Sequence, residues 1–228
     1  MLAISRDDSP ARKSETAYEK LKELAISGQI RPGRHLIAQD IAEHLGISVT
    51  PLRDAMVRLA VEGFLDHENR HGFYSKEFRV EEQRQILDMC ELLLAQGLRA
   101  AEGNIPEHLL RACAELEAVP VDPANGAPLA ARVKQIYLEI TRAAGNDVLY
   151  DTFRIMVERS HRMRILDLQI ESAARETIDD LRTVGVAMAA KDSERAVGVV
   201  RAVFGRRGER MPLLVREANF IASEVKFP

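Results

Sequence analysis

The sequence predicts a mainly α-helical protein: an N-terminal winged helix-turn-helix with a small β-hairpin, followed by an all-α antiparallel helical bundle. Apolar side chains recur at helical spacing along most of the chain. Two short helical stretches separated by a glycine turn precede two strand-like stretches, and after Arg79 the pattern is helical again. For 228 residues we expect one small and one medium domain. The expected parts are a flexible N-terminus over residues 1–13, a winged helix-turn-helix over 14–78 and a helical domain over 79–228.

Three short helices are expected in the small domain. The first runs from Ser14 to Ser27, with Ser14 as its N-cap. The second spans about Ala38 to Leu45 and ends at a glycine. Ser48 is expected to cap the third, which tolerates Pro51 in its first turn and stops at the next glycine. The last two helices, joined by a tight glycine turn, predict a helix-turn-helix.

A hairpin is expected directly after these helices. Phe64–Asp66 and Phe73–Ser75 are short strand-like stretches, and the polar segment His67–Gly72 separates them. A polar connection between two such stretches is typical of a two-stranded hairpin. Three helices and a hairpin in about 65 residues are the pattern of a winged helix-turn-helix.

The rest of the chain is expected to form about six antiparallel helices. Their boundaries come from glycine, asparagine and proline positions that interrupt the apolar stripe. The expected helices run from about residue 80 to Ala101, Ile105–Ala118, Leu129–Ala144, Asp147–Leu168, Ser172–Lys191, Asp192–Arg210 and Leu213–Val225, with a loop at Val119–Pro128.

Composition indicates an ordinary globular protein, with 46% apolar and 29% charged residues. The net charge of −3 argues neither for nor against a nucleic-acid partner, since a local basic surface can bind DNA. No stretch resembles a signal peptide or a membrane span, so we expect a cytoplasmic protein without a membrane partner. The two cysteines, Cys90 and Cys113, have no zinc-site spacing and are expected to be small core residues.

The segment Ser27–Tyr74 resembles the DNA-binding domain of GntR-type regulators. It contains, in order, SGxxxPG, the pattern LAxxLGxSxTPxRxAxxxL with Ile41 in place of the first leucine, and EGxL…GxY. The resemblance covers most of residues 14–78. It implies a winged helix-turn-helix that binds double-stranded operator DNA in a sequence-specific manner.

The third helix carries the residues best suited to reading bases. A helix that enters the major groove with its N-terminal end needs short polar residues there and a cation that reaches past them. Ser48, Thr50 and Arg53 supply these, and a guanidinium can contact a guanine edge with two hydrogen bonds. The alternative is a solvated Arg53 paired with Asp54 or Glu62.

The resemblance adds further DNA contacts. Val49 stands where many relatives have arginine, so it removes a donor but could contact a thymine methyl group. The hairpin tip is implied to approach the minor groove, and a residue near the start of the second helix is implied to face DNA. Alternatively, the hairpin tip is an ordinary turn. These residues are Arg70, His71 and Gly72 at the tip, and Gln39 in the second helix.

Residues from about Val80 to Phe227 resemble the helical C-terminal (FCD-type) domain of the FadR subfamily. The resemblance rests on the AAGN stop at Ala143–Asn146 and on AMAAKDSERA at Ala187–Ala196. Many relatives bind a divalent metal there through one Asp and three His. The matching positions in this chain hold no such ligand, so we expect no metal and no cofactor; they are Val133, Tyr137, Leu181 and Val203.

Without a metal, an effector pocket is expected to be more apolar. Its candidate lining is Tyr137, Ser160, Leu181 and Val203, and the alternative is that these side chains simply pack in the core. His108 and His161 are expected to have surface or core roles. A cluster of basic residues could approach DNA or bind an anion, but by default we expect it to stay solvated. Its members are Arg154, Arg159, Arg162 and Arg164. Arg206, Arg207 and Arg210 are expected to interact favourably with a helix C-terminus.

The functional expectation is a homodimeric transcriptional regulator, in most of the subfamily a repressor, whose helical domain dimerises and responds to a small-molecule effector. The alternative is a constitutive DNA-binding dimer that senses nothing. An enzyme is not expected, because the sequence contains no G-x-S-x-G, no phosphate-binding glycine loop, no H-E-x-x-H and no Cys/His constellation.

Overall fold

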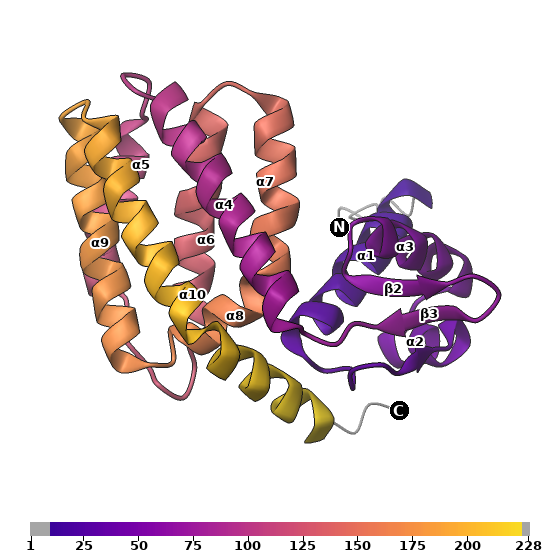
Figure 1. Ribbon diagram of the computed structural model, residues 1–228. Coiled ribbons are helices and arrows are strands. Elements are labelled where there is room, and N and C mark those ends of the chain that lie inside the picture. Colours follow the sequence, from indigo (N-terminus) through magenta and orange to yellow (C-terminus); the bar gives the residue numbers. More distant parts are fainter. Residues whose placement is uncertain (1–9, 225–228) are drawn as a thin grey trace, which may run out of the picture. The chain divides into compact units, whose positions relative to one another are not determined.

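The computed structural model describes residues 10–224, which form ten α-helices, one 3-10 turn and a small sheet (Figure 1). The chain divides into two compact units. One contains the residues up to Phe78 together with those from Asn219 onward, and the other contains Arg79–Ala218. No helix in the described residues is long and apolar enough to cross a membrane.

Helices α1 (Pro10–Ser27), α2 (Ala38–Leu45) and α3 (Val49–Val61) form the body of the N-terminal unit. The expected helix start at Ser14 is wrong, because α1 already begins at Pro10. Proline is tolerated in a first helical turn, and the Ala, Arg and Lys that follow are good helix formers. Of the expected flexible segment 1–13, residues 1–9 lie outside the described residues.

The core of this unit joins α1 to α3. Tyr18, Leu21, Leu52 and Leu59 are all at most 1% exposed. The Tyr18 hydroxyl donates a hydrogen bond of 2.5 Å to Glu62, and the guanidinium carbon of Arg58 lies 3.6 Å from the centre of the Tyr18 ring. This packing fixes the orientation of α3, the expected recognition helix.

The sheet has three strands rather than the expected two. Strands β2 (Leu65–Glu68) and β3 (Gly72–Ser75) form the hairpin, and β1 (His35–Leu36) pairs with the other edge of β3. The third strand was missed because β1 has only two residues, which is too short for an alternating pattern. Ser75 secures it: its N–H donates to the Arg34 carbonyl at 3.0 Å, and its carbonyl accepts from Gly33 N–H at 2.9 Å.

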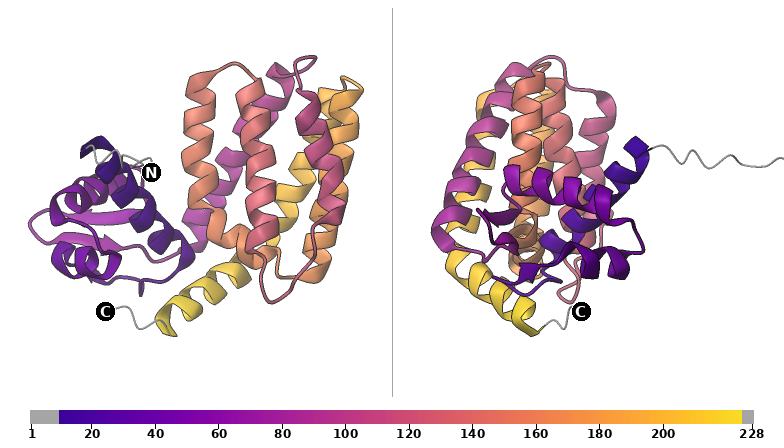
Figure 2. Two further views of the ribbon diagram at one scale, coloured as in Figure 1. Left: turned by 180° about the vertical axis from the view of Figure 1, so that it is seen from behind. Right: turned by 90° about the vertical axis from the view of Figure 1, so that its right-hand side faces the viewer.

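The second unit is an all-helical bundle in which the long helices lie side by side and short α8 crosses one end (Figures 1 and 2). A 3-10 turn at Leu116–Ala118 directly follows its second helix. The bounds of its helices are α4 (Val80–Ala100), α5 (Glu107–Glu115), α6 (Ala127–Ala143), α7 (Asp147–Arg159), α8 (His161–Asp167), α9 (Glu171–Ala189) and α10 (Ser193–Glu224).

Two expected helix boundaries in this unit are wrong. The helix expected over Asp147–Leu168 is broken at Ser160, whose hydroxyl donates to the Val157 carbonyl at 3.1 Å and so competes with regular helix geometry. Conversely, Pro212 does not end a helix but lies inside α10. Met211 and Leu214 beside it are at most 2% exposed, and this packing outweighs the hydrogen bond that proline cannot make.

The C-terminal end of α10 belongs to the N-terminal unit. The Asn219 side chain donates to the Phe78 carbonyl at 2.8 Å and accepts from the Phe78 N–H at 3.1 Å. The Arg31 guanidinium donates to the Ser223 carbonyl at 2.9 Å, which satisfies one of the last carbonyls of the helix. The expected domain of residues 79–228 therefore differs from the second compact unit at its C-terminal end.

Other local expectations are confirmed. The expected stop at Ala143–Asn146 is present, since α6 ends at Ala143 and Gly145 takes φ +66°; Asn146 then caps α7 by accepting from the Leu149 N–H at 3.0 Å. The expected boundary between Lys191 and Asp192 is marked by a left-handed Lys191 at φ +57°. Cys90 and Cys113 are fully buried and carry free thiols.

Candidate functional site

The turn between α2 and α3 exposes the beginning of α3. Gly46 takes φ +65°, and the next N–H, that of Ile47, donates to the Ala42 carbonyl at 3.0 Å, which ends α2. Ser48 and Thr50 are exposed at the start of α3, and no side chain caps its first-turn N–H groups. These N–H groups and the positive end of the helix dipole are therefore open to an anion such as a DNA phosphate.

Arg53 is exposed one turn further along α3 and makes no hydrogen bond or ion pair within the described residues. The alternative that it pairs with Glu62 is wrong, because Glu62 instead accepts from Tyr18 and from Arg58 at 3.2 Å. The guanidinium of Arg53 is thus free to contact an external partner. Its role in reading bases stays a prediction.

The other expected DNA contacts differ in exposure. Gln39 is exposed in the first turn of α2, and Arg70 and His71 are exposed at the tip of the hairpin. Arg70 itself takes a left-handed conformation at φ +71°. Val49 is half-buried and packs against the core of the unit, so only part of its side chain is available for a thymine methyl group.

Gly72 shapes the hairpin tip. It takes φ +99°, and a Cβ atom there would lie 2.9 Å from Nε2 of His35. The His35 ring in turn lies 5.1 Å from the ring of Tyr74 on β3. Gly72 is therefore needed for the backbone of the tip, whether or not it approaches DNA.

In the helical unit, the four positions that match a metal site do not suit a metal ion. Val133, Leu181 and Val203 are buried apolar side chains, and Tyr137 is a buried phenol. Within the described residues, no group of three or more His, Cys, Asp or Glu side chains is placed to hold a metal. These residues therefore do not fit the one-Asp, three-His site of metal-binding relatives.

A buried charge cluster lies in the helical unit instead. Arg164 and Arg207 are 1% exposed and Asp167 is fully buried. Arg207 Nε donates to Asp167 at 2.8 Å, and Arg210 Nε donates to the other carboxylate oxygen at 2.6 Å. The default expectation of solvation is wrong for Arg164, and Arg207 and Arg210 lie inside α10 rather than at a helix end.

Among the described residues, the groups that accept from Arg164 are all uncharged. Its Nη atoms lie 3.3 Å from the Val157 carbonyl, 3.0 Å from the Ser160 hydroxyl and 3.0 Å from Nδ1 of His161. Burial, together with the charge of Arg164, lowers the pKa of His161 to about 3, so this imidazole is neutral at physiological pH. Burial and the nearby charge of Arg207 lower the pKa of Arg164 to about 10, which still leaves the guanidinium charged.

The four expected effector residues are all buried, and the structure groups two of them. Ser160 contacts Arg164 directly, and Tyr137 lies close enough for Arg207 and Arg164 to oppose the rise in its pKa that burial causes. Leu181 and Val203 are buried on α9 and α10. Assignment of these residues to an effector stays a prediction.

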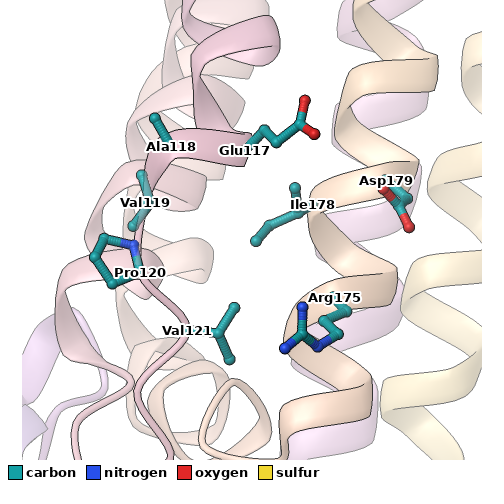
Figure 3. A pocket seen from close by; sticks show the side chains of 8 residues that line it. All are labelled: Glu117, Ala118, Val119, Pro120, Val121, Arg175, Ile178 and Asp179. Carbon is teal, nitrogen blue, oxygen red and sulfur yellow. The ribbon is translucent and has the colours of Figure 1, made fainter.

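Two surface hollows lie elsewhere on the helical unit. The first, of about 370 Å³, lies between the segment Glu117–Val121 and α9, where Arg175 and Ile178 line it (Figure 3). The second, of about 340 Å³, lies between α4 and α10, and its lining includes Leu87 and Phe204. None of the four expected effector residues lines either hollow.

Sequence reasoning missed the Arg207–Asp167–Arg210 group. The sequence favours a dipole-compensating role for the two arginines, and Asp167, their partner, lies 40 positions before Arg207 in the chain. The only local signal was the spacing of Arg207 and Arg210 by three residues, which places both on one helix face.

Comparison with known proteins identifies both parts of the chain. Residues 13–74 match the family model described as bacterial regulatory proteins of the gntR family, and residues 85–206 match the FCD domain model. The chain belongs to the GntR family and carries an FCD domain. It is thus a GntR-family transcriptional regulator, as the sequence motifs predicted.

Individual relatives match this GntR regulator over part of its length. The Nta operon transcriptional regulator of Aminobacter aminovorans is 39% identical over 69 residues, 30% of this chain and 31% of the relative. YdhC of Bacillus subtilis, an HTH-type transcriptional regulator, is 32% identical over 66 residues, 29% of this chain and 30% of the relative. The matches therefore span about a third of the length of these relatives.

Solved structures share the fold of the whole GntR chain. Escherichia coli McbR/YncC has a TM-score of 0.70 at 20% identity, covering 91% of this chain and 99% of that one. A GntR regulator from Rhodococcus sp. RHA1 has a TM-score of 0.65 at 16% identity, with 89% and 98% coverage. These likenesses confirm the winged helix-turn-helix and the helical C-terminal domain.

Proposed function

We propose that this GntR regulator is a cytoplasmic, homodimeric repressor that binds double-stranded operator DNA and releases it when a small organic effector binds the helical unit. The observation that carries the DNA-binding part is the exposed start of α3, where Ser48 and Thr50 are open to solvent and Arg53 has no partner among the described residues. A surface guanidinium beside uncapped helix N–H groups is suited to a phosphate and a guanine edge.

In this proposal, α3 enters the major groove and the hairpin tip approaches the minor groove. Ser48, Thr50 and Arg53 read base edges or hold the adjacent phosphate, while Arg70 and His71 supply contacts from the tip. Gln39 in α2 contacts the backbone from the other side of the turn. Two such units in a homodimer would read a two-fold symmetric operator and double the phosphate contacts.

The proposed role of the helical unit is regulatory rather than catalytic. Helix α10 carries Arg207 in the second unit and Asn219 in the first, so one continuous helix belongs to both. An effector that changes the position of this helix would bias the DNA-binding units of the dimer. The rival proposal, a constitutive DNA-binding dimer, predicts that no small molecule changes operator affinity.

The DNA-binding part is tested with the full chain. Operator sequences are selected from randomised duplexes, and affinity is then measured by fluorescence anisotropy for the wild type and for Arg53→Ala. Loss of a bidentate guanine contact costs roughly 1–3 kcal/mol, or about 5- to 150-fold in affinity, and relaxes specificity at one position. Arg111→Ala, an exposed arginine on α5, is the matched control and should leave affinity unchanged.

Unchanged affinity and specificity in Arg53→Ala would contradict the assignment of α3 as the recognition helix. Light scattering on the same samples measures the oligomeric state, and a monomer at operator-binding concentrations would contradict the dimer. A reporter gene behind the selected operator distinguishes repression from activation, because a repressor lowers its expression.

A further inference from the structure

Four buried donor atoms in the helical unit have no hydrogen-bond partner among the described residues, and one of them, Nε of Arg162, belongs to a partly exposed residue. The other three are the Tyr137 hydroxyl, Nε of Arg164 and Nη2 of Arg207. Each belongs to a side chain that is at most 1% exposed. Unpartnered buried donors are costly and therefore rare in folded proteins, so these three require an acceptor that the described chain does not supply.

The three donors come from different helices but share one neighbourhood. Tyr137 lies on α6, Arg164 on α8 and Arg207 on α10. The Phe204 ring joins two of them, because it lies 5.8 Å from the Tyr137 ring and 5.9 Å from the guanidinium carbon of Arg207. The charge of Arg164 acts on Tyr137 as well. An acceptor placed among these side chains would therefore meet all three helices.

The same neighbourhood has an excess of positive charge. Asp167 is hydrogen-bonded to Arg207 and Arg210, whereas Arg164 donates only to the neutral groups of Val157, Ser160 and His161. Within the described residues, two fully buried guanidiniums thus share one fully buried carboxylate, that of Asp167. Buried charges are normally paired, because an isolated ion loses its hydration without compensation.

We propose that Arg164, Arg207 and Tyr137 bind the carboxylate of a small organic monoanion, without a metal, between α6, α8 and α10. This inference rests on the proposed function and names the chemical class of its effector. A single negative charge balances Arg164, the fully buried guanidinium that has no carboxylate partner among the described residues, and two carboxylate oxygens accept hydrogen bonds from the three donors. Arginine is suited to this role because its planar N–H groups match a carboxylate.

The neighbouring surface hollow indicates the chemical character of the rest of the bound organic anion. Phe204 lines the hollow between α4 and α10 and also lies next to the rings and guanidinium of the cluster, so it adjoins both. Leu87 adds a second apolar side chain to the lining. An acid with an apolar body would place its carboxylate on the arginines and its body toward Phe204. In this proposal the arginines bind the carboxylate, and apolar side chains contact only the rest of the ligand.

The test compares carboxylates with their neutral amides on the full-length protein. Acetate, hexanoate and benzoate are titrated by calorimetry and by thermal shift, each beside acetamide, hexanamide or benzamide, and inorganic phosphate serves as a second anion. At least one carboxylate should raise Tm and bind at least tenfold more tightly than its amide and than phosphate. Native mass spectrometry of the purified protein checks for an organic acid that is already bound.

Tyr137→Phe separates anion binding from folding. It removes a hydroxyl that has no partner among the described residues, so Tm without ligand should stay the same or rise. Affinity for the carboxylate should fall about tenfold, the effect of losing one hydrogen bond to a charged group. Arg175→Ala is the matched control, because this exposed arginine lines the other hollow (Figure 3) and should leave the affinity unchanged.

Several results would overturn the anion site. These are no retained acid together with no carboxylate binding, equal binding of acid and amide, or equal carboxylate affinity in Tyr137→Phe and the wild type. Because binding is measured without DNA, its failure leaves operator binding intact and distinguishable. Carboxylate binding that leaves operator affinity unchanged would support the site and overturn only the effector role in the proposed function.

Discussion

Replacement of Asp167 by asparagine should destabilise the helical unit severely. The carboxylate is fully buried and accepts hydrogen bonds from Arg207 at 2.8 Å and Arg210 at 2.6 Å. Asparagine keeps the shape but removes the charge, so the buried guanidiniums of Arg207 and Arg164 then face no negative charge in the cluster. Breaking a buried ion pair by removing one partner costs roughly 3–5 kcal/mol, and we expect a loss in that range.

Urea unfolding followed by far-UV circular dichroism measures this loss, because most of the helix lies in the second unit. With a slope of roughly 3 kcal/mol per molar urea, a loss of 4 kcal/mol lowers the midpoint by about 1.3 M. Asp151→Asn, at an exposed position on α7, is the control and should change stability by less than about 0.5 kcal/mol. A loss below about 1 kcal/mol in Asp167→Asn would refute the idea that this carboxylate balances the buried arginines.

The ion pairs of Asp167 with Arg207 and Arg210 make the free energy of unfolding depend on pH. Burial by itself would raise the pKa of Asp167, but Arg207 and Arg210 outweigh it, so the pKa is lower than usual. In the unfolded chain an Asp side chain has a pKa of about 3.9. Its contribution is therefore present above about pH 4 and is lost as pH falls through the folded pKa. The stability difference between the wild type and Asp167→Asn should be constant above about pH 5 and narrow below about pH 4.

Three further predictions concern single side chains. Gly72→Ala should destabilise the N-terminal unit by roughly 1–3 kcal/mol in thermal unfolding, since it adds a contact of 2.9 Å with His35 to the strain at φ +99°. Gly33→Ala, with φ +70° but open space, should cost less, and equal losses would contradict the clash. Tyr18→Phe should cost roughly 1.5–3 kcal/mol through its hydrogen bond to Glu62, and a loss below about 0.5 kcal/mol would argue against this bond. Burial raises the pKa of Cys90 to about 11, and burial together with Glu139 raises the pKa of Cys113 to about 12. Iodoacetamide at pH 8 should therefore modify both thiols in urea and neither in the native protein. Rapid alkylation of the native protein would contradict this prediction.

The features that sequence predicted well are those with a local cause. Gly46 ends α2 because it adopts a left-handed conformation, and Gly145, also left-handed, lies at the predicted stop between α6 and α7. Each signal acts within a few residues, so it is visible without knowledge of the fold. The two-residue strand β1 has no such signal, because it forms only where β3 offers an edge. The same distinction applies to the proposed DNA-binding surface, where the bounds of α3 follow from local signals but the half-burial of Val49 depends on packing.

The sequence does not reveal the buried Arg207–Asp167–Arg210 group because the helix end expected at Pro212 is wrong. That boundary assigns the arginines to a helix C-terminus. If Pro212 ended a helix, Arg206, Arg207 and Arg210 would lie in its last turns, where cations are favourable. Helix α10 instead continues to Glu224, so these residues lie in its interior, where no helix terminus explains them. Similarly, the helix is broken at Ser160, and Arg164 beyond the break donates to the Val157 carbonyl before it. Helix continuity therefore decides whether an arginine of this chain is an ordinary surface charge or part of the buried charge cluster.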